Sequence, residues 1–144
     1  MYERKVLGLE EVFKAVNAMS EAVPRESRPI SIAVMDDRGD LICLARMDKA
    51  HGFTNKMAIR KAYTSARRRI DTSKLGKHLK ESGWSIADLG PEYTTIPGGI
   101  AIVKSGEETV FGSIGVSGRI PASEDEEIAL IGLKTLQDVL WSSK

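Results

Sequence analysis

Four charged residues stand beside apolar segments, where they could take part in chemistry. Arg46 and Asp48 follow the apolar run that begins at Leu41. The planar guanidinium of an arginine binds a carboxylate through two parallel hydrogen bonds, so Arg46 could hold an organic acid. Asp48, Lys61 and Asp125 could move protons as general acids or bases. The simpler structural roles are a salt bridge between Arg46 and Asp48 at the strand end, a solvated side chain for Lys61 and a helix cap for Asp125.

Glycines form a second pattern, because they occur at the ends of apolar strand-like segments. A strand that runs through glycines brings bare backbone close to whatever it faces, which is either another part of the chain or a ligand. The acidic residues 124–127 would compete with an external anion for the helix that they begin, so an anion is expected at the glycine turn instead. The residues concerned are Gly98, Gly99, Gly112, Gly115, Ser117 and Gly118.

The two histidines, His51 and His78, are isolated in the sequence. Neither has a second histidine or a cysteine at ligand spacing, so no structural metal site is predicted. A single histidine can still be an axial haem ligand, and His51 is the better candidate because it lies in a loop. The only cysteine, Cys43, lies within an apolar run and is expected to be a buried thiol.

Composition excludes several classes of protein. The chain has 144 residues, 42% hydrophobic and 28% charged, which fits one globular domain over residues 1–144. The formal net charge is +1, so there is no electrostatic case for nucleic acid or membrane as a partner. The N-terminus carries charges where a secretion signal would be apolar, and we expect a cytoplasmic protein.

Hydrophobic periodicity predicts an α+β fold. Apolar residues at helical spacing predict helices from residue 9 to near Pro24, over 54–68 and 74–82, and from 123 onward, the last with a capping box of Ser123 and Glu126. Strands are predicted over residues 30–35 and 41–47, which form a hairpin covered on both faces, and over 94–96, 100–103 and 109–116. Because the strands occur in hairpins, the sheet should be antiparallel and covered by helices.

Several segments together resemble the GlcG/HbpS family, which includes the C-terminal domain of PduO-type proteins. They are IAVMD at 32–36, RMD at 46–48, KAYTSA at 61–66, PGG at 97–99 and GSIGVSG at 112–118, followed by DE at 125–126. The resemblance covers nearly the whole chain in order. It implies a profilin-like α/β/α arrangement around a five-stranded antiparallel sheet, assembly into homo-oligomers, haem binding, and operons for the catabolism of organic acids or diols.

Two functions follow from this resemblance. The first is a ligand-binding protein that holds haem or a small carboxylate in a pocket lined by the glycine turns. No histidine occurs between residues 9 and 29, where haem-binding relatives carry one, so a small anion is better supported than haem. The second is a small catabolic enzyme that acts on a hydroxy or keto acid, or on a ring-cleavage product, and whether the chain is an enzyme stays open. The residues that match the family's pocket are Arg46, Asp48, Lys61, Gly98, Gly99, Ser117 and Gly118, with Asp125 as a further acid or base.

Overall fold

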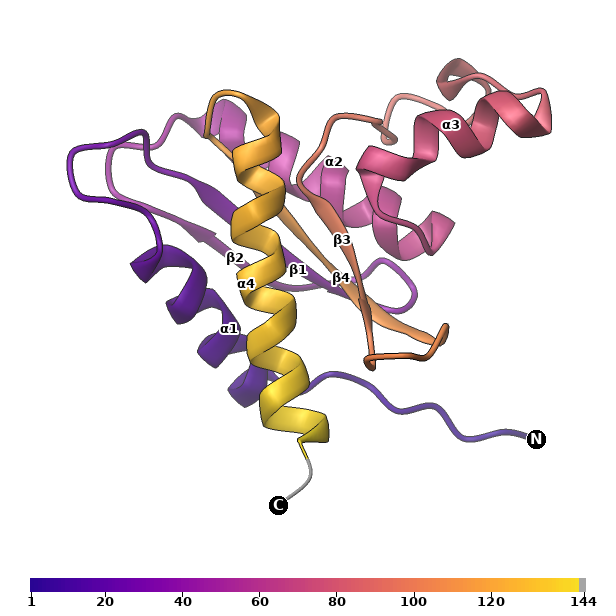
Figure 1. The fold of residues 1–144 in the computed structure, drawn as a ribbon, viewed down its shortest axis with the longest axis horizontal. Coiled ribbons are helices and arrows are strands. Elements are labelled where there is room, and N and C mark those ends of the chain that lie inside the picture. Colours follow the sequence, from indigo (N-terminus) through magenta and orange to yellow (C-terminus); the bar gives the residue numbers. More distant parts are fainter. Residues whose placement is uncertain (143–144) are drawn as a thin grey trace.

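The computed structural model describes residues 1–142, which form four α-helices, a short 3₁₀ helix and four strands (Figure 1). In chain order these elements are α1 (Leu9–Glu21), β1 (Ser31–Asp36), β2 (Leu41–Arg46), α2 (Gly52–Arg68), α3 (Thr72–Ser82), η1 (Ile86–Asp88), β3 (Gly99–Val103), β4 (Val110–Ser117) and α4 (Ala122–Trp141). The α+β class and the antiparallel sheet that the periodicity predicts are therefore confirmed.

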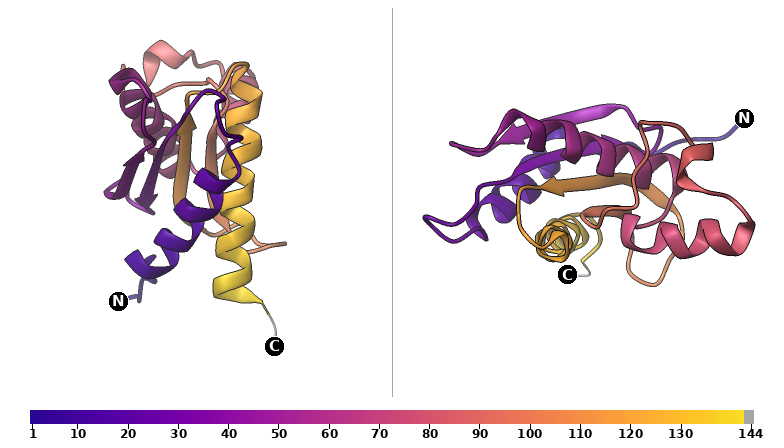
Figure 2. Two further views of the ribbon diagram at one scale, coloured as in Figure 1. Left: turned by 90° about the vertical axis from the view of Figure 1, so that its left-hand side faces the viewer. Right: turned by 90° about the horizontal axis from the view of Figure 1, so that it is seen from above.

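The strands form one antiparallel sheet in the order β2-β1-β4-β3. α1 and α4 cover one face and α2 covers the other, so the chain has three layers (Figure 2). The main hydrophobic core lies between the sheet and the α1–α4 layer. Its fully buried members include Val12, Met19, Ile32, Ile100, Ile114 and Leu136.

The opposite face is thinner, because α2 packs directly on the backbone of β4. A Cβ atom at Gly115 would collide with the carbonyl oxygen of Ala58 and the amide nitrogen of Ala62. Both alanines are fully buried and present only methyl groups to the sheet. This close approach holds α2 against the sheet. It therefore sets the position of the α2 side chains that lie at the end of the sheet.

The described chain has four strands where the resemblance implied five. Residues 94–96, expected to be a short strand, are irregular, and the Thr94 amide donates to the Thr64 hydroxyl (3.0 Å). The outer edge of β3 is already occupied by side chains, since the Gly99 amide donates to the Thr72 hydroxyl (3.0 Å) and the Ala101 amide to an Asp71 oxygen (2.9 Å). These two backbone amides are therefore not available to a further strand.

Two local expectations also prove wrong. β2 is an edge strand with Leu41 and Leu44 exposed, so the first hairpin is not covered on both faces. α4 begins one residue earlier than expected, after Pro121, with no side-chain cap, and Glu126 accepts a hydrogen bond from Ser73 on α3 instead of forming a capping box. Within residues 1–142, no helix is long and apolar enough to cross a membrane.

Candidate functional site

Lys61 and Asp125 form an ion pair that is almost completely buried. The Lys61 Nζ atom lies 3.0 Å from the Asp125 Oδ2 atom and donates a second hydrogen bond to the Val116 carbonyl (2.9 Å). Each side chain has an exposed fraction of 2%. The pair joins α2 to α4, the helices on the two opposite faces of the sheet. Sequence analysis named both residues but did not predict that they meet.

The surrounding backbone holds this pair in place. Gly98 has a φ of +126°, and a Cβ atom there would lie 3.0 Å from both the Asp125 Cβ atom and the Lys61 Cδ atom. A side chain at this position is therefore excluded on two grounds. The Arg119 amide donates to the Asp125 Oδ1 atom (2.9 Å), so each carboxylate oxygen has a donor. Asp125 closes the turn before α4 as well as neutralising Lys61.

Burial shifts the two groups in opposite directions. It raises the pKa of the Asp125 carboxyl and lowers the pKa of the Lys61 ammonium, and their mutual attraction offsets part of each shift. Such a pair is chemically suited to proton exchange. However, a substrate cannot reach it in this conformation, because both side chains are sealed from solvent.

A row of polar residues crosses three strands at the same end of the sheet. Arg46 on β2 pairs with Ser31 on β1, which pairs with Ser117 on β4. Directly paired residues point to the same face of a sheet, so these three side chains lie on one face. The Ser31 hydroxyl donates to the Asn55 Oδ1 atom (2.6 Å) in the first turn of α2, which shows that this is the α2 face. Sequence analysis missed Ser31 and Asn55, because serine and asparagine at element ends are common without any function.

Packing within the chain explains two of the glycines that were predicted to contact a ligand, Gly99 and Gly118. A Cβ atom at Gly99 would meet the Lys61 carbonyl oxygen, and one at Gly118 would meet the Pro29 carbonyl oxygen. The space that each glycine leaves is therefore filled by the chain itself. Packing accounts for both residues without a ligand, and their role in binding stays a prediction.

Asp48 and His51 lie in the loop between β2 and α2, away from the ion pair. Both are exposed, and His51 is the N-cap residue of α2 with no side-chain capping bond. Among the described residues, no ion pair joins Arg46 to Asp48 within 4 Å. The strand-end salt bridge considered from the sequence is absent, which leaves Arg46 free to meet an anion.

Asp48 lines a surface hollow of about 620 Å³ between this loop and the segment after α1. Its lining residues are Ser20, Glu21, Val23, Pro24, Arg25, Glu26, Ser27, Pro29, Met47, Asp48 and Lys49. Met47 belongs to the RMD motif of the family resemblance but was not predicted as a ligand, and its half-buried side chain also packs against the main core. Across residues 1–142, no three His, Cys, Asp or Glu side chains gather as a metal site would require.

These features define a three-layer α+β domain. It contains a buried lysine–aspartate pair and a surface hollow that is lined by apolar and charged residues. Residues 7–134 match the family described as "Haem degrading protein HbpS-like". The chain therefore belongs to the HbpS-like family, in agreement with the resemblance drawn from its motifs.

Individual relatives agree with this assignment. Protein GlcG of Escherichia coli strain K12 is 29% identical over 117 residues, which cover 81% of this chain and 85% of GlcG. The crystal structure of a double mutant of HbpS from Streptomyces reticuli superposes with a TM-score of 0.81 at 29% identity, covering 99% of this chain and 92% of HbpS. A PduOC:heme complex has the same fold, with a TM-score of 0.77 at 21% identity and coverage of 91% and 95%.

Proposed function

We propose that this protein binds haem in the hollow between residues 20–29 and 47–49. The description of the family names haem degradation. The structure of HbpS superposes on this chain with a TM-score of 0.81, and PduOC, which has the same fold, forms a complex with haem. The observation that carries the proposal is the chemistry of the lining, in which the Met47 thioether stands among apolar side chains, two cations and the three carboxylates of Glu21, Glu26 and Asp48.

The residues of the hollow fit the group. Val23, Pro24 and Pro29 offer apolar surface for the macrocycle, and Arg25 and Lys49 are cations suited to its propionates. A thioether or an imidazole can ligate haem iron. The lining supplies the Met47 thioether, and His51 follows four residues later. We therefore propose the segment 47–51 as the source of the axial ligand.

Bound haem would supply redox chemistry at its iron. The chain's own part is to exclude water from one face of the ring with Val23, Pro24 and Pro29, and to orient the propionates with Arg25 and Lys49.

A hemin titration followed at the Soret band tests the proposal. We expect saturable binding to the wild-type protein, and a loss of affinity of about tenfold or a displaced band in either Met47→Leu or His51→Ala, depending on which residue is the ligand. His78→Ala is the matched control, because His78 is also exposed but lies on α3. Failure of the wild type to shift the Soret band at micromolar hemin would overturn the proposal, as would wild-type behaviour of both variants.

A second candidate function is acid–base catalysis on a hydroxy or keto acid, which the shifted pKa values of Lys61 and Asp125 favour. In this account Arg46 holds the substrate carboxylate and the exposed Asp48 moves the proton, whereas the buried Lys61–Asp125 pair would have to open before Lys61 or Asp125 could take part. Arg46→Ala should then abolish turnover of a panel of organic acids without unfolding the chain, since Arg46 is exposed. Absence of turnover across the panel would exclude this function.

A further inference from the structure

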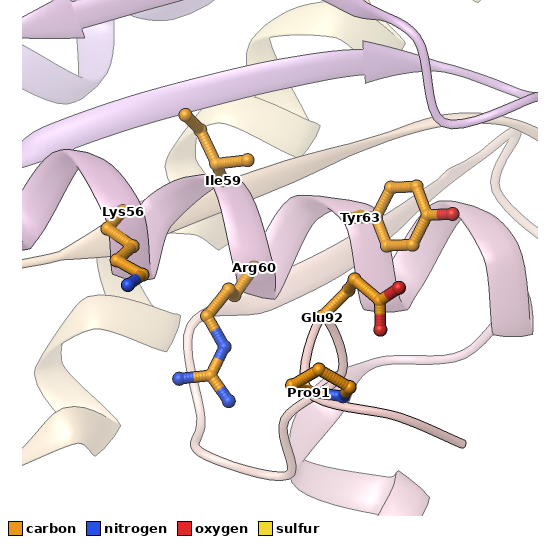
Figure 3. Close-up of a pocket in the computed structure, with 6 residues that line it drawn as sticks. All are labelled: Lys56, Ile59, Arg60, Tyr63, Pro91 and Glu92. Carbon is orange, nitrogen blue, oxygen red and sulfur yellow. The ribbon is translucent and has the colours of Figure 1, made fainter.

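Arg60 and Pro91 stand between two hollows on the surface beside α2. The hollow drawn in Figure 3 has an almost entirely apolar lining, which includes Ile59 and Tyr63. The Arg60 guanidinium points away from those two side chains, toward the side of α2 on which the Pro91 turn lies. The second hollow, here called the Arg60 hollow, encloses about 360 Å³. Its lining is Arg60, Ile86, Ala87, Gly90, Pro91, Tyr93, Thr94 and Thr95.

The Arg60 guanidinium is held in place but is not neutralised. One terminal nitrogen donates to the Tyr93 carbonyl (3.3 Å), and the other lies 3.5 Å from the Met57 sulfur, which is a weak acceptor. The Nε atom is buried without a hydrogen-bond partner. Each terminal nitrogen carries two N–H groups, so the guanidinium keeps unused donors at its outer end. A guanidinium that meets only neutral groups lacks its best partner, which is a carboxylate.

No carboxylate of the chain balances this charge. Within residues 1–142, no acidic side chain lies within 4 Å of the Arg60 guanidinium, and none lines the Arg60 hollow. Asp88 accepts hydrogen bonds from the Ser85 amide (2.8 Å) and hydroxyl (3.1 Å). Glu92 lines the apolar hollow, and in Figure 3 its carboxylate points toward Tyr63 and away from Arg60. The Arg60 hollow therefore presents one positive charge, which a single negative charge from outside would balance.

Two threonines add hydroxyl groups to the same lining. The Thr94 hydroxyl accepts a hydrogen bond from the Ile96 amide (3.1 Å), which leaves its proton free to donate, and Thr95 is half-buried beside it. The Thr64 hydroxyl accepts from the Thr94 amide (3.0 Å) and donates to the Arg60 carbonyl (2.7 Å). This relay fixes the threonine segment relative to Arg60, so the cation and the hydroxyls belong to one preformed site.

We propose that the Arg60 hollow binds a small polar monocarboxylate, with its carboxylate on the terminal nitrogens of Arg60 and its other hydrogen-bonding groups on Thr94 and Thr95. A monoanion balances the single cation, whereas a dianion would bring a second charge without a partner. The volume is at the lower end of the range for small-molecule sites, about 300–1,000 Å³, and suits a molecule of few carbon atoms. The lining shares no residue with the proposed haem hollow and does not include Arg46.

A titration followed through backbone amide NMR signals tests this proposal, with N-acetylglycinate as the probe and N-acetylglycinamide as its neutral counterpart. We expect N-acetylglycinate to shift the signals of residues 86–87 and 93–95 saturably. It should bind about tenfold more tightly than the amide, because charge-assisted hydrogen bonds are about twice as strong as neutral ones. Arg60→Gln should reduce its affinity to that of the amide. Arg68→Gln should change neither affinity, since Arg68 is an exposed arginine of the same helix outside the hollow.

Three results would overturn the proposal: no saturable shift at residues 86–87 and 93–95, equal binding of the two compounds to the wild type, or a preference for the carboxylate that survives in Arg60→Gln. Sulfate that binds these residues as tightly as N-acetylglycinate at the same ionic strength would also overturn it. The comparison on the wild type needs no variant, so it stands even if Arg60→Gln fails to fold. Failure of hemin to bind would leave these results intact, so the two proposals fail separately.

Discussion

Removing either partner of the Lys61–Asp125 pair should destabilise the protein strongly, whereas removing both should cost much less. Lys61→Met deprives the Asp125 carboxylate and the Val116 carbonyl of a shared donor, and Asp125→Asn leaves a buried ammonium without a counter-charge. Breaking a buried ion pair from one side costs about 3–5 kcal/mol, because an uncompensated charge stays inside. We therefore expect each single variant to lose about 3 kcal/mol of the free energy of unfolding.

The double variant Lys61→Met/Asp125→Asn no longer buries a charge. Its remaining defects are the Val116 carbonyl, which lacks a donor, and the side-chain amide that replaces the Asp125 carboxylate, which together should cost about 1–2 kcal/mol. The coupling energy between the two positions is then about 4–5 kcal/mol, from single losses of about 3 kcal/mol each and the smaller loss of the double variant. Urea unfolding followed by circular dichroism at one fixed protein concentration gives all four free energies.

A surface pair provides the control for this cycle. Lys134 and Asp138 on α4 are also a lysine and an aspartate, 2.7 Å apart, but their side chains are 72% and 59% exposed. Lys134→Met should cost less than about 0.5 kcal/mol, because solvent screens exposed ion pairs. If the Lys61 and Asp125 variants behaved like this control and their effects were additive, the conclusion that the buried pair is sealed and joins the two helical layers would be refuted.

Two further predictions follow from the same region. Because burial raises the pKa of Asp125, the folded state binds more protons than the unfolded state between the ordinary aspartate pKa and the raised one, so stability relative to Asp125→Asn should increase as the pH falls through that window in urea titrations. Gly115→Ala should lose at least about 2 kcal/mol by thermal or urea unfolding, since its Cβ atom would collide with the backbone of α2, while Gly52→Ala, with open space around it, should be nearly neutral.

The sequence predicted most of the fold because local signals were clear. Proline and glycine punctuation and hydrophobic periodicity placed every α-helix and the four observed strands within a few residues. The expected fifth strand is not formed, for a physical reason that the composition does not reveal. Thr72 and Asp71 close the outer edge of β3, and these two residues look like an ordinary helix start in the sequence. The exposure of β2 follows from its place at the sheet edge, which strand patterns alone do not give.

The candidate site was predictable only in part. Lys61 and Asp125 stand 64 residues apart, on helices that cover opposite faces of the sheet, so their contact depends on the complete fold. The hollow beside Met47 is built from the last turn of α1, the segment that follows it and the loop between β2 and α2. In each case the residue types could be read from the sequence, but the residues that they contact could not.

Paramagnetic broadening of backbone amide NMR signals by ferric haem tests the central proposal most directly, because it locates the ligand. With diamagnetic zinc protoporphyrin as the reference, we predict that the amide signals of residues 47–51 and of the non-proline residues of 20–29 disappear while those of residues 56–63 persist. Unchanged signals in both loops, or broadening confined to residues 56–63 and 91–92, would contradict haem binding in the hollow beside Met47.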